Sequence, residues 1–253
     1  MTATGPLNLC SGQYAYSCNG KPQAIHESWS VCGEPGSLLR IVSERSTDSG
    51  QFSLRVNGLY RLAAKESARF FRLRNYEPEL VELAFTNSDG EVTASYQALD
   101  GRLRLQRSVN AKEIFPATVM ESLLLFPLLR IFTGPIVRKL HAVGEFAAVC
   151  VPDIRPGRNL DALLTPLISQ RRARLLRRGR KEIDGRHIGA DCFEYRGGEY
   201  PPGTLFWVDD HDVLLGYEWK NHDGETWQVQ LQAYQFSEDS AALHLRDADP
   251  NEA

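Results

Sequence analysis

Six Asn-Gly or Asp-Gly dipeptides divide the chain, and they constrain its fold more than any other feature. These residues adopt the positive φ angles of tight turns, so such a pair between two alternating runs predicts a β-hairpin. Four pairs fall before residue 102 and two fall after residue 183. Both ends of the chain are therefore predicted to be β-rich. The pairs are Asn19-Gly20, Asn57-Gly58, Asp89-Gly90, Asp100-Gly101, Asp184-Gly185 and Asp223-Gly224.

Short apolar or alternating runs lie between the turns and predict strands, spaced by roughly 8 to 12 residues as in antiparallel sheets. A strand after residue 171 competes with a helix that Thr165-Pro166 would begin and Gly179 would end, and we favour the strand. The predicted strands are 11–18, 23–32, 37–45, 51–56, 59–63, 68–73, 79–86, 91–99, 102–109, 145–151, 172–183, 188–195, 204–208, 213–220 and 226–236.

The pattern of apolar residues changes from strand-like to helix-like in the middle of the chain. Residues 116–140 form an apolar stretch that is too long for one strand, and it is broken by Pro127 and by Gly134-Pro135. We expect two short helices with a kink. Glu121 and Arg130 fall inside the stretch, so a membrane-spanning helix is disfavoured. A second helical pattern begins at Asn159 and continues through several leucines to residue 170.

These patterns predict a mainly β (α+β) fold. We expect a single curved antiparallel sheet or half-barrel, with a helical insertion packed on its concave face. One domain would cover residues 1–240, with the helical insertion near 116–142 and 159–170. Residues 241–253 are predicted to form a frayed acidic tail.

The formal net charge is −3, so the chain has no long-range positive field to attract nucleic acid, and we expect no nucleic-acid partner. Residues 171–181 carry seven cations, which either form a solvated face or contact an anionic partner. The first 20 residues lack the basic and apolar regions of a secretory signal, so we expect a cytoplasmic protein. The sequence does not determine the oligomeric state.

The five cysteines, Cys10, Cys18, Cys32, Cys150 and Cys192, include no C-x-x-C pair. We interpret them as buried thiols, with a nucleophile among them as the alternative.

The order of elements and three segments together resemble a known family. The segments are Arg180-Lys181-Glu182-Ile183-Asp184-Gly185-Arg186, Phe206-Trp207-Val208-Asp209 and Leu214-Leu215-Gly216-Tyr217-Glu218-Trp219. This pattern resembles the LolA-like half-barrel proteins, which carry lipoproteins and other acylated molecules. The resemblance implies an incompletely closed, strongly curved sheet around helices that act as a lid.

Aromatic residues on the predicted strands are the candidate ligand contacts. Residues two apart on a strand share a face, so Tyr14 lies beside Tyr16, and Tyr217 lies beside Trp219. Such rings either line a pocket or fill the core. The predicted ligand-binding residues are Tyr14, Tyr16, Trp29, Trp207, Tyr217 and Trp219.

Carboxyl groups next to these aromatics are the candidate acids or bases. Glu27 shares its face with Ile25 and Trp29, whereas His26 faces the other side. A carboxyl group on an apolar face is either a general acid or base or a paired structural group. The catalytic candidates are Glu27, Glu218 and Tyr217.

Asp209-Asp210-His211-Asp212 is the densest cluster of residues that ligate metals, but it falls where a hairpin must reverse. We interpret it as a turn, with no metal site and no cofactor. The chain has no Gly-rich phosphate loop, no Gly-x-Ser-x-Gly elbow and no His-Glu-x-x-His helix, which disfavours nucleotide enzymes and metalloproteases.

The functional hypothesis is binding of a hydrophobic or amphipathic small molecule, lipid-like or isoprenoid- or polyketide-like, in the cavity of a half-barrel. The alternative is a cofactor-independent isomerase, cyclase or hydratase that uses tyrosine or carboxyl groups in the same cavity.

Overall fold

Fifteen strands of the chain join into one open, curved sheet. The computed structural model describes residues 7–63, 71–121, 124–156, 158–198 and 200–237. From edge to edge the strand order is β8-β7-β6-β5-β4-β3-β2-β1-β15-β14-β13-β12-β11-β10-β9. Neighbouring strands are antiparallel except β9 and β10, which run parallel, so the sheet is mixed.

The first eight strands form one half of the sheet, the first arm, and the remaining seven form the second arm. The first arm consists of β1 (Leu7–Cys18), β2 (Lys21–Glu34), β3 (Leu38–Thr47), β4 (Phe52–Leu62), β5 (Tyr76–Asn87), β6 (Gly90–Leu99), β7 (Arg102–Val109) and β8 (Lys112–Glu121). The second arm consists of β9 (Leu124–Leu125), β10 (Ala147–Pro152), β11 (Pro166–Ile183), β12 (Arg186–Gly197), β13 (Tyr200–Asp209), β14 (Leu214–Lys220) and β15 (Thr226–Phe236).

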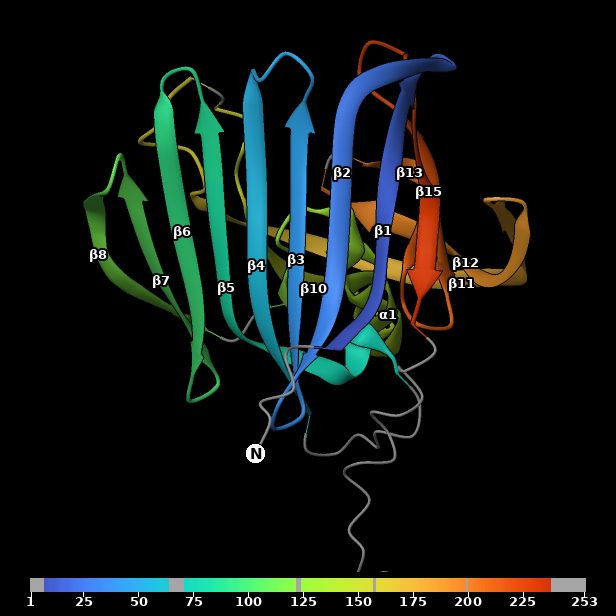
Figure 1. Ribbon diagram of the computed structural model, residues 1–253, viewed down its shortest axis with the longest axis horizontal. Helices are drawn as coiled ribbons and strands as arrows, with labels where there is room; N and C mark the ends of the chain where they lie inside the picture. Colours follow the sequence, from blue (N-terminus) through green and yellow to red (C-terminus); the bar gives the residue numbers. More distant parts are fainter. Residues whose placement is uncertain (1–6, 64–70, 122–123, 157, 199, 238–253) are drawn as a thin grey trace, which may run out of the picture.

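The one α-helix of the described residues, α1 (Thr133–Val143), lies between the two arms. Figure 1 shows β11 and β12 passing behind the first arm and crossing its strands. The helix packs on β11 and on the short 3-10 helix η1 (Leu73–Asn75), and a second short helix, η2 (Arg130–Phe132), leads into it. Because the sheet curls over, buried side chains of both arms and of α1 form one core.

The turn dipeptides predicted the first arm well. The hairpin around Asn19-Gly20 is confirmed, and so are the turns at Asp89-Gly90 and Asp100-Gly101. Asn57-Gly58 is not a turn but lies inside β4, which replaces the two strands predicted over 51–56 and 59–63. Gly58 pairs with β3 on one side and with β5 on the other, so two complete ladders outweigh the local turn preference. Most of the predicted strand 68–73 lies outside the described residues.

The predicted helix over the start of 116–140 is wrong. Residues up to Glu121 belong to β8, which pairs with β7 at one edge of the sheet, and helical structure begins only at Arg130. The apolar run that resembles a helix face instead continues the ladder of a neighbouring strand, and tertiary pairing overrides helix propensity there.

The predicted helix over 159–170 is also wrong. The chain makes turns up to Thr165, and β11 begins at Pro166. Leu164 is fully buried with a φ of 57°, a left-handed conformation that a right-handed helix cannot continue through. Tertiary hydrogen bonds satisfy the backbone here, since the Leu164 N–H donates to the Asp153 carbonyl at 2.6 Å.

The coarse expectation of a mainly β fold with a helix packed on a curved, open sheet is confirmed. The helical insertion is shorter than predicted, and the sheet is mixed instead of purely antiparallel. Among the described residues, no helix has the length and apolar character that crossing a membrane requires. The acidic tail 241–253 lies outside the described residues, and the single domain stays a prediction.

Close approach of α1 to the turn between β13 and β14 gives a test of this packing. A methyl group on Gly134 would lie 1.9 Å from the Asp212 carbonyl oxygen, so Gly134→Ala forces helix and turn apart. We expect the free energy of unfolding to fall by about 3 kcal/mol, measured by urea denaturation. Gly189→Ala is the matched control, because nothing lies within 4 Å of its added methyl group. Equal stability of the two variants would contradict the packing.

Candidate ligand-binding pocket

The carboxylate of Glu27 joins three strands of the first arm to the segment that enters α1. Glu27 on β2 is 1% exposed. It accepts hydrogen bonds from the Tyr16 hydroxyl of β1 at 2.5 Å and from Arg45 Nε of β3 at 2.8 Å. Its other oxygen accepts a hydrogen bond from the backbone N–H of Arg130. Alternation along the strand predicts that Glu27 and Trp29 share one face, and both are buried.

This anchoring fixes two guanidinium groups beside a pocket. Arg45 Nη2 also donates to the Leu128 carbonyl at 3.2 Å, and Leu128 has a φ of 71°, a conformation that costs energy in a non-glycine residue. The Arg130 guanidinium lies over the rings of Tyr16 and Tyr217, at 5.9 and 5.2 Å from their centroids. Contacts of this kind stabilise a cation that has left water.

Aromatic rings of β13 and β14 form one wall beside these cations. Phe206 stacks on Tyr217 at 4.5 Å, and Tyr217 stacks on Trp219 at 5.0 Å. Tyr200 meets Tyr217 and Trp219 edge-on, and its hydroxyl donates to the Tyr217 hydroxyl at 3.3 Å. The predicted shared face of Tyr217 and Trp219 is therefore confirmed.

Arg171 on β11 supplies a third guanidinium group, and this one is buried. It is 7% exposed, and it donates to the Tyr195 hydroxyl at 2.8 Å and to Ser169 Oγ at 2.7 Å. Its charge lies 5.6 Å from the ring centroid of Phe126. Arg171 is thus held by neutral groups.

These walls enclose a pocket of about 510 Å³, within the roughly 300 to 1,000 Å³ that small-molecule sites occupy. Apolar and aromatic side chains make up most of its lining, and four arginines face it. The lining residues are Arg45, Phe126, Leu128, Arg130, Val151, Pro152, Asp153, Ile154, Arg155, Leu167, Ile168, Ser169, Arg171, Gly198, Tyr200 and Trp219.

A second pocket of about 500 Å³ lies on the other side of the segment 124–132. Phe126, Leu128 and Arg130 face the first pocket, whereas the second is lined by neighbours of theirs such as Leu125 and Phe132. The segment is therefore a shared wall between the two pockets.

The remaining candidate residues lie elsewhere. Tyr14 and Trp29 are buried in the core, where the Tyr14 hydroxyl donates to the Leu214 carbonyl at 2.9 Å. Trp207 lies on the opposite face of β13 from Phe206, under Arg177 and Lys181. Glu218 is exposed and does not line the pocket. Of the predicted ligand contacts, Trp219 lines the pocket directly, and Tyr16 and Tyr217 contact Arg130 behind it.

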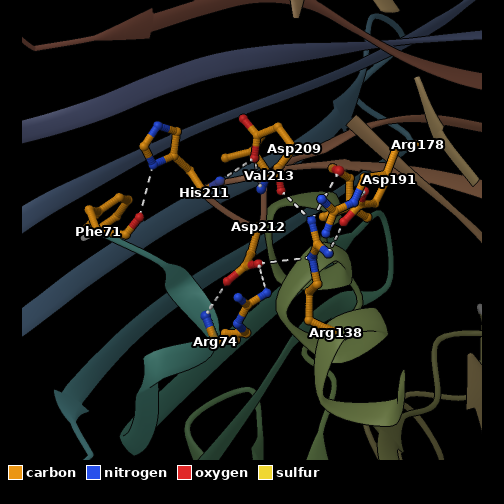
Figure 2. A network of polar contacts seen from close by, with 10 residues as sticks. Phe71, Arg74, Arg138, Arg178, Asp191, Asp209, His211, Asp212 and Val213 are labelled. Carbon is orange, nitrogen blue, oxygen red and sulfur yellow. Dashed lines mark hydrogen bonds and ion pairs between the residues drawn. The ribbon is translucent and has the colours of Figure 1, made fainter. Parts of the chain in front are cut away.

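The Asp209–Asp212 cluster forms the turn between β13 and β14, and the carboxylates of Asp209 and Asp212 bind protein groups (Figure 2). Asp212 accepts a hydrogen bond from the Arg74 backbone at 2.9 Å and forms an ion pair with Arg138 of α1 at 3.2 Å. Arg138 also pairs with Asp191 of β12 at 2.5 Å. The network therefore ties α1 to both β12 and the turn. Among the described residues, no three His, Cys, Asp or Glu side chains are arranged to hold a metal ion.

The basic run 171–181 lies along β11 and is divided between the two faces of the sheet. Arg171 is buried at the pocket, whereas Arg174 and Arg178 are exposed and pair with Glu194 and Asp191 at 3.0 and 3.2 Å. The exposed arginines of this run therefore match the interpretation as a solvated face. No pattern in the basic run distinguishes the buried Arg171 from its exposed neighbours.

All five cysteines are free thiols, and four of them are buried. Burial raises the pKa of the Cys150 thiol to about 11, and it also raises the pKa of Cys192. A raised pKa keeps a thiol protonated and unreactive at neutral pH.

Sequence reasoning missed the arginines of the pocket. Alternation along β3 places Arg45 on the same face as Leu39, Ile41 and Ser43, so its inward direction could have been predicted. Arg130 begins the three-residue 3-10 helix η2, which is too short for a periodic pattern to indicate the direction of its side chain.

No protein-family model and no curated protein matches the chain. Among solved structures, MucB is similar with a TM-score of 0.25 and 12% identity over 92% of this chain, which spans 56% of the length of MucB. A DUF1329 family protein from Desulfovibrio piger is similar with a TM-score of 0.20 and 9% identity, covering 92% of this chain and 87% of that protein. Both likenesses are weak and assign no function, so the resemblance to LolA-like proteins stays a prediction. The cytoplasmic location stays a prediction.

Asp209 gives a pH test of the turn. Burial raises its pKa from 3.8 to about 6, against hydrogen bonds from the Val213 and His211 N–H groups and the Tyr234 hydroxyl. The folded state then binds the proton more tightly than the unfolded state does, so the free energy of unfolding should fall as pH rises between about 4 and 6.

Asp209→Asn removes this titration, and urea denaturation across the range should show a shallower slope. Some slope will remain, because burial also raises the pKa of Asp212. An unchanged slope in Asp209→Asn would show that Asp209 ionises normally.

Proposed function

We propose that the protein binds an amphipathic small molecule in the pocket between the two arms of the sheet. The observation that carries the proposal is the lining of this pocket. The pocket has a volume of about 510 Å³. Its lining is mostly apolar and aromatic, and it includes guanidinium groups that the fold holds in fixed positions. Apolar walls with a few placed polar groups are typical of small-molecule sites. A lipid-like or isoprenoid-like molecule fits this description.

Trp219 supports the proposal because its ring is only partly covered by protein. It is half-buried, stacks on Tyr217 and Trp227, and presents its remaining surface to the pocket. A rigid ring offers a large contact area and has few rotatable bonds to fix on binding.

The contacts of Glu27 favour a positioning role over acid–base catalysis. Its two oxygens already accept hydrogen bonds from Tyr16, Arg45 and the backbone of Arg130. Burial raises the pKa of the Tyr16 hydroxyl, which therefore stays protonated and donates to Glu27. These groups hold one another in place, and we infer that they shape the binding pocket.

The test uses N-phenyl-1-naphthylamine, an uncharged apolar dye whose fluorescence rises in apolar surroundings. We expect the full-length protein to bind the dye, and Trp219→Ala to weaken binding by about tenfold, since loss of a ring contact is worth about 1.4 kcal/mol. Fluorescence titration gives both dissociation constants.

Trp207→Ala is the matched control, because it removes a tryptophan from a neighbouring strand on the opposite face. Its affinity for the dye should equal that of the unmodified protein. Urea denaturation of both variants separates binding from folding. If Trp219→Ala is destabilised by about 3 to 5 kcal/mol and its folded fraction binds with full affinity, Trp219 is a core residue and the pocket assignment fails.

A further inference from the structure

The arginines of the pocket differ in whether a carboxylate neutralises them. Arg45 pairs with Glu27 at 2.8 Å, and Arg155 pairs with Asp153 at 2.8 Å. Arg130 and Arg171 have no carboxylate within ion-pair distance among the described residues. The charge of Glu27 acts on Arg130 as well as on Arg45, so one carboxylate serves two guanidinium groups, and Arg171 forms no ion pair among the described residues.

The surroundings of these two arginines are unusual for charged groups that form no ion pair. Arg171 is 7% exposed and contacts only neutral hydrogen-bond partners. The Nε of Arg130 is buried with no hydrogen-bond partner among the described residues. Removing a charge from water costs several kcal/mol unless another charge offsets it. Aromatic faces offset only part of this cost.

The two guanidinium groups also face common neighbours. Arg171 donates to the Tyr195 hydroxyl, whose ring contacts that of Tyr200 at 5.5 Å. Tyr200 contacts Tyr217 at 5.6 Å, and the Arg130 charge lies over the ring of Tyr217. Both arginines line the same pocket as Tyr200. The charges of both arginines act on the Tyr195 hydroxyl, where they oppose the rise of its pKa that burial causes, so both would attract an anion bound near this hydroxyl.

The rest of the pocket suits a hydrocarbon chain. Val151, Ile154, Leu167 and Ile168 line it, and Ile168 is 60% exposed. An exposed large aliphatic side chain next to a pocket indicates its open end, whereas the buried side chains of Arg45 and Arg171 mark its inner end. The lining thus changes from apolar at the opening to cationic inside.

We propose that the ligand is a single-chain amphiphile with an anionic head, a carboxylate or a phosphate monoester, bound with the head inside against Arg130 and Arg171. This inference rests on the proposed function and specifies its ligand. Guanidinium groups bind either head through paired, charge-assisted hydrogen bonds. The hydrocarbon chain extends past Leu167 toward Ile168.

The experiment measures how well twelve-carbon compounds displace N-phenyl-1-naphthylamine from the full-length protein. Dodecanoate, dodecyl phosphate and dodecanol share the chain and differ in the head, so their competition constants isolate its contribution. We expect at least one of the two anions to compete at a concentration at least tenfold lower than dodecanol. The better anion distinguishes a carboxylate ligand from a phosphate ligand.

Substitutions of the two arginines show whether they cause the preference for an anionic head over dodecanol. Arg130→Met and Arg171→Met keep an apolar stem and remove the charge, so each should reduce the preference to below threefold while leaving dodecanol binding unchanged. Arg180→Met is the matched control, because Arg180 is an exposed arginine of the same strand as Arg171. It should keep the full preference.

Stability gives a second readout. Arg171 is buried against neutral partners, so Arg171→Met should unfold at the same urea concentration as the unmodified protein or a higher one. Arg45→Met, by contrast, leaves Glu27 without its partner and should unfold at a lower concentration.

The outcomes separate the two proposals. If the dye binds but dodecanol competes as well as both anions do, the pocket binds apolar molecules and the anionic head is refuted. If the preference survives in both Arg130→Met and Arg171→Met, the head binds elsewhere and the inference also fails. If the dye does not bind at all, the proposed function itself fails. The comparison of anions with dodecanol needs no variant, so it decides the question even if a variant does not fold.

Discussion

The buried carboxylate of Glu27 is the contact on which the pocket depends. It binds Tyr16, Arg45 and the backbone of Arg130, which belong to β1, β3 and the segment before α1. Breaking a buried ion pair from one side costs about 3 to 5 kcal/mol, a large share of the stability of a domain. This contact fixes where the segment 124–132 crosses the sheet, and with it the wall between the two pockets.

A second polar network holds α1 itself. Arg138 joins α1 to Asp191 of β12 and to Asp212 of the β13–β14 turn. Together the two networks fix α1 and its preceding segment against both arms of the sheet. An open sheet of this size has no closed ladder to keep its arms apart at a set distance, so these buried charges define the shape of the space between them.

The sheet was predictable from the sequence where turn chemistry and alternation agree. Asn19-Gly20 between two alternating runs specifies a hairpin, and the inward face shared by Glu27 and Trp29 followed from their spacing. The segment 116–121 was not predictable, because a local apolar run is compatible with both a helix and an edge strand, and pairing with β7 decides between them.

The candidate site was predictable only in part, for the same reason. Trp219 was found because aromatic alternation marks a strand face, and Arg45 could have been found in the same way. The roles of Arg130 and Arg171 depend on contacts between segments far apart in the chain, such as Arg171 with Tyr195 and Arg130 with Glu27. The local sequence does not show which charged side chains will lack an ion-pair partner in the folded protein.

The most direct test of the account is a crystal structure of the protein grown with dodecanoate. The account predicts the carboxylate within about 3.2 Å of guanidinium nitrogens of both Arg130 and Arg171, with the chain running along Leu167 toward Ile168. A carboxylate at the pocket opening beside Arg155, or a dodecanoate bound only on the exposed arginines of β11, would contradict it.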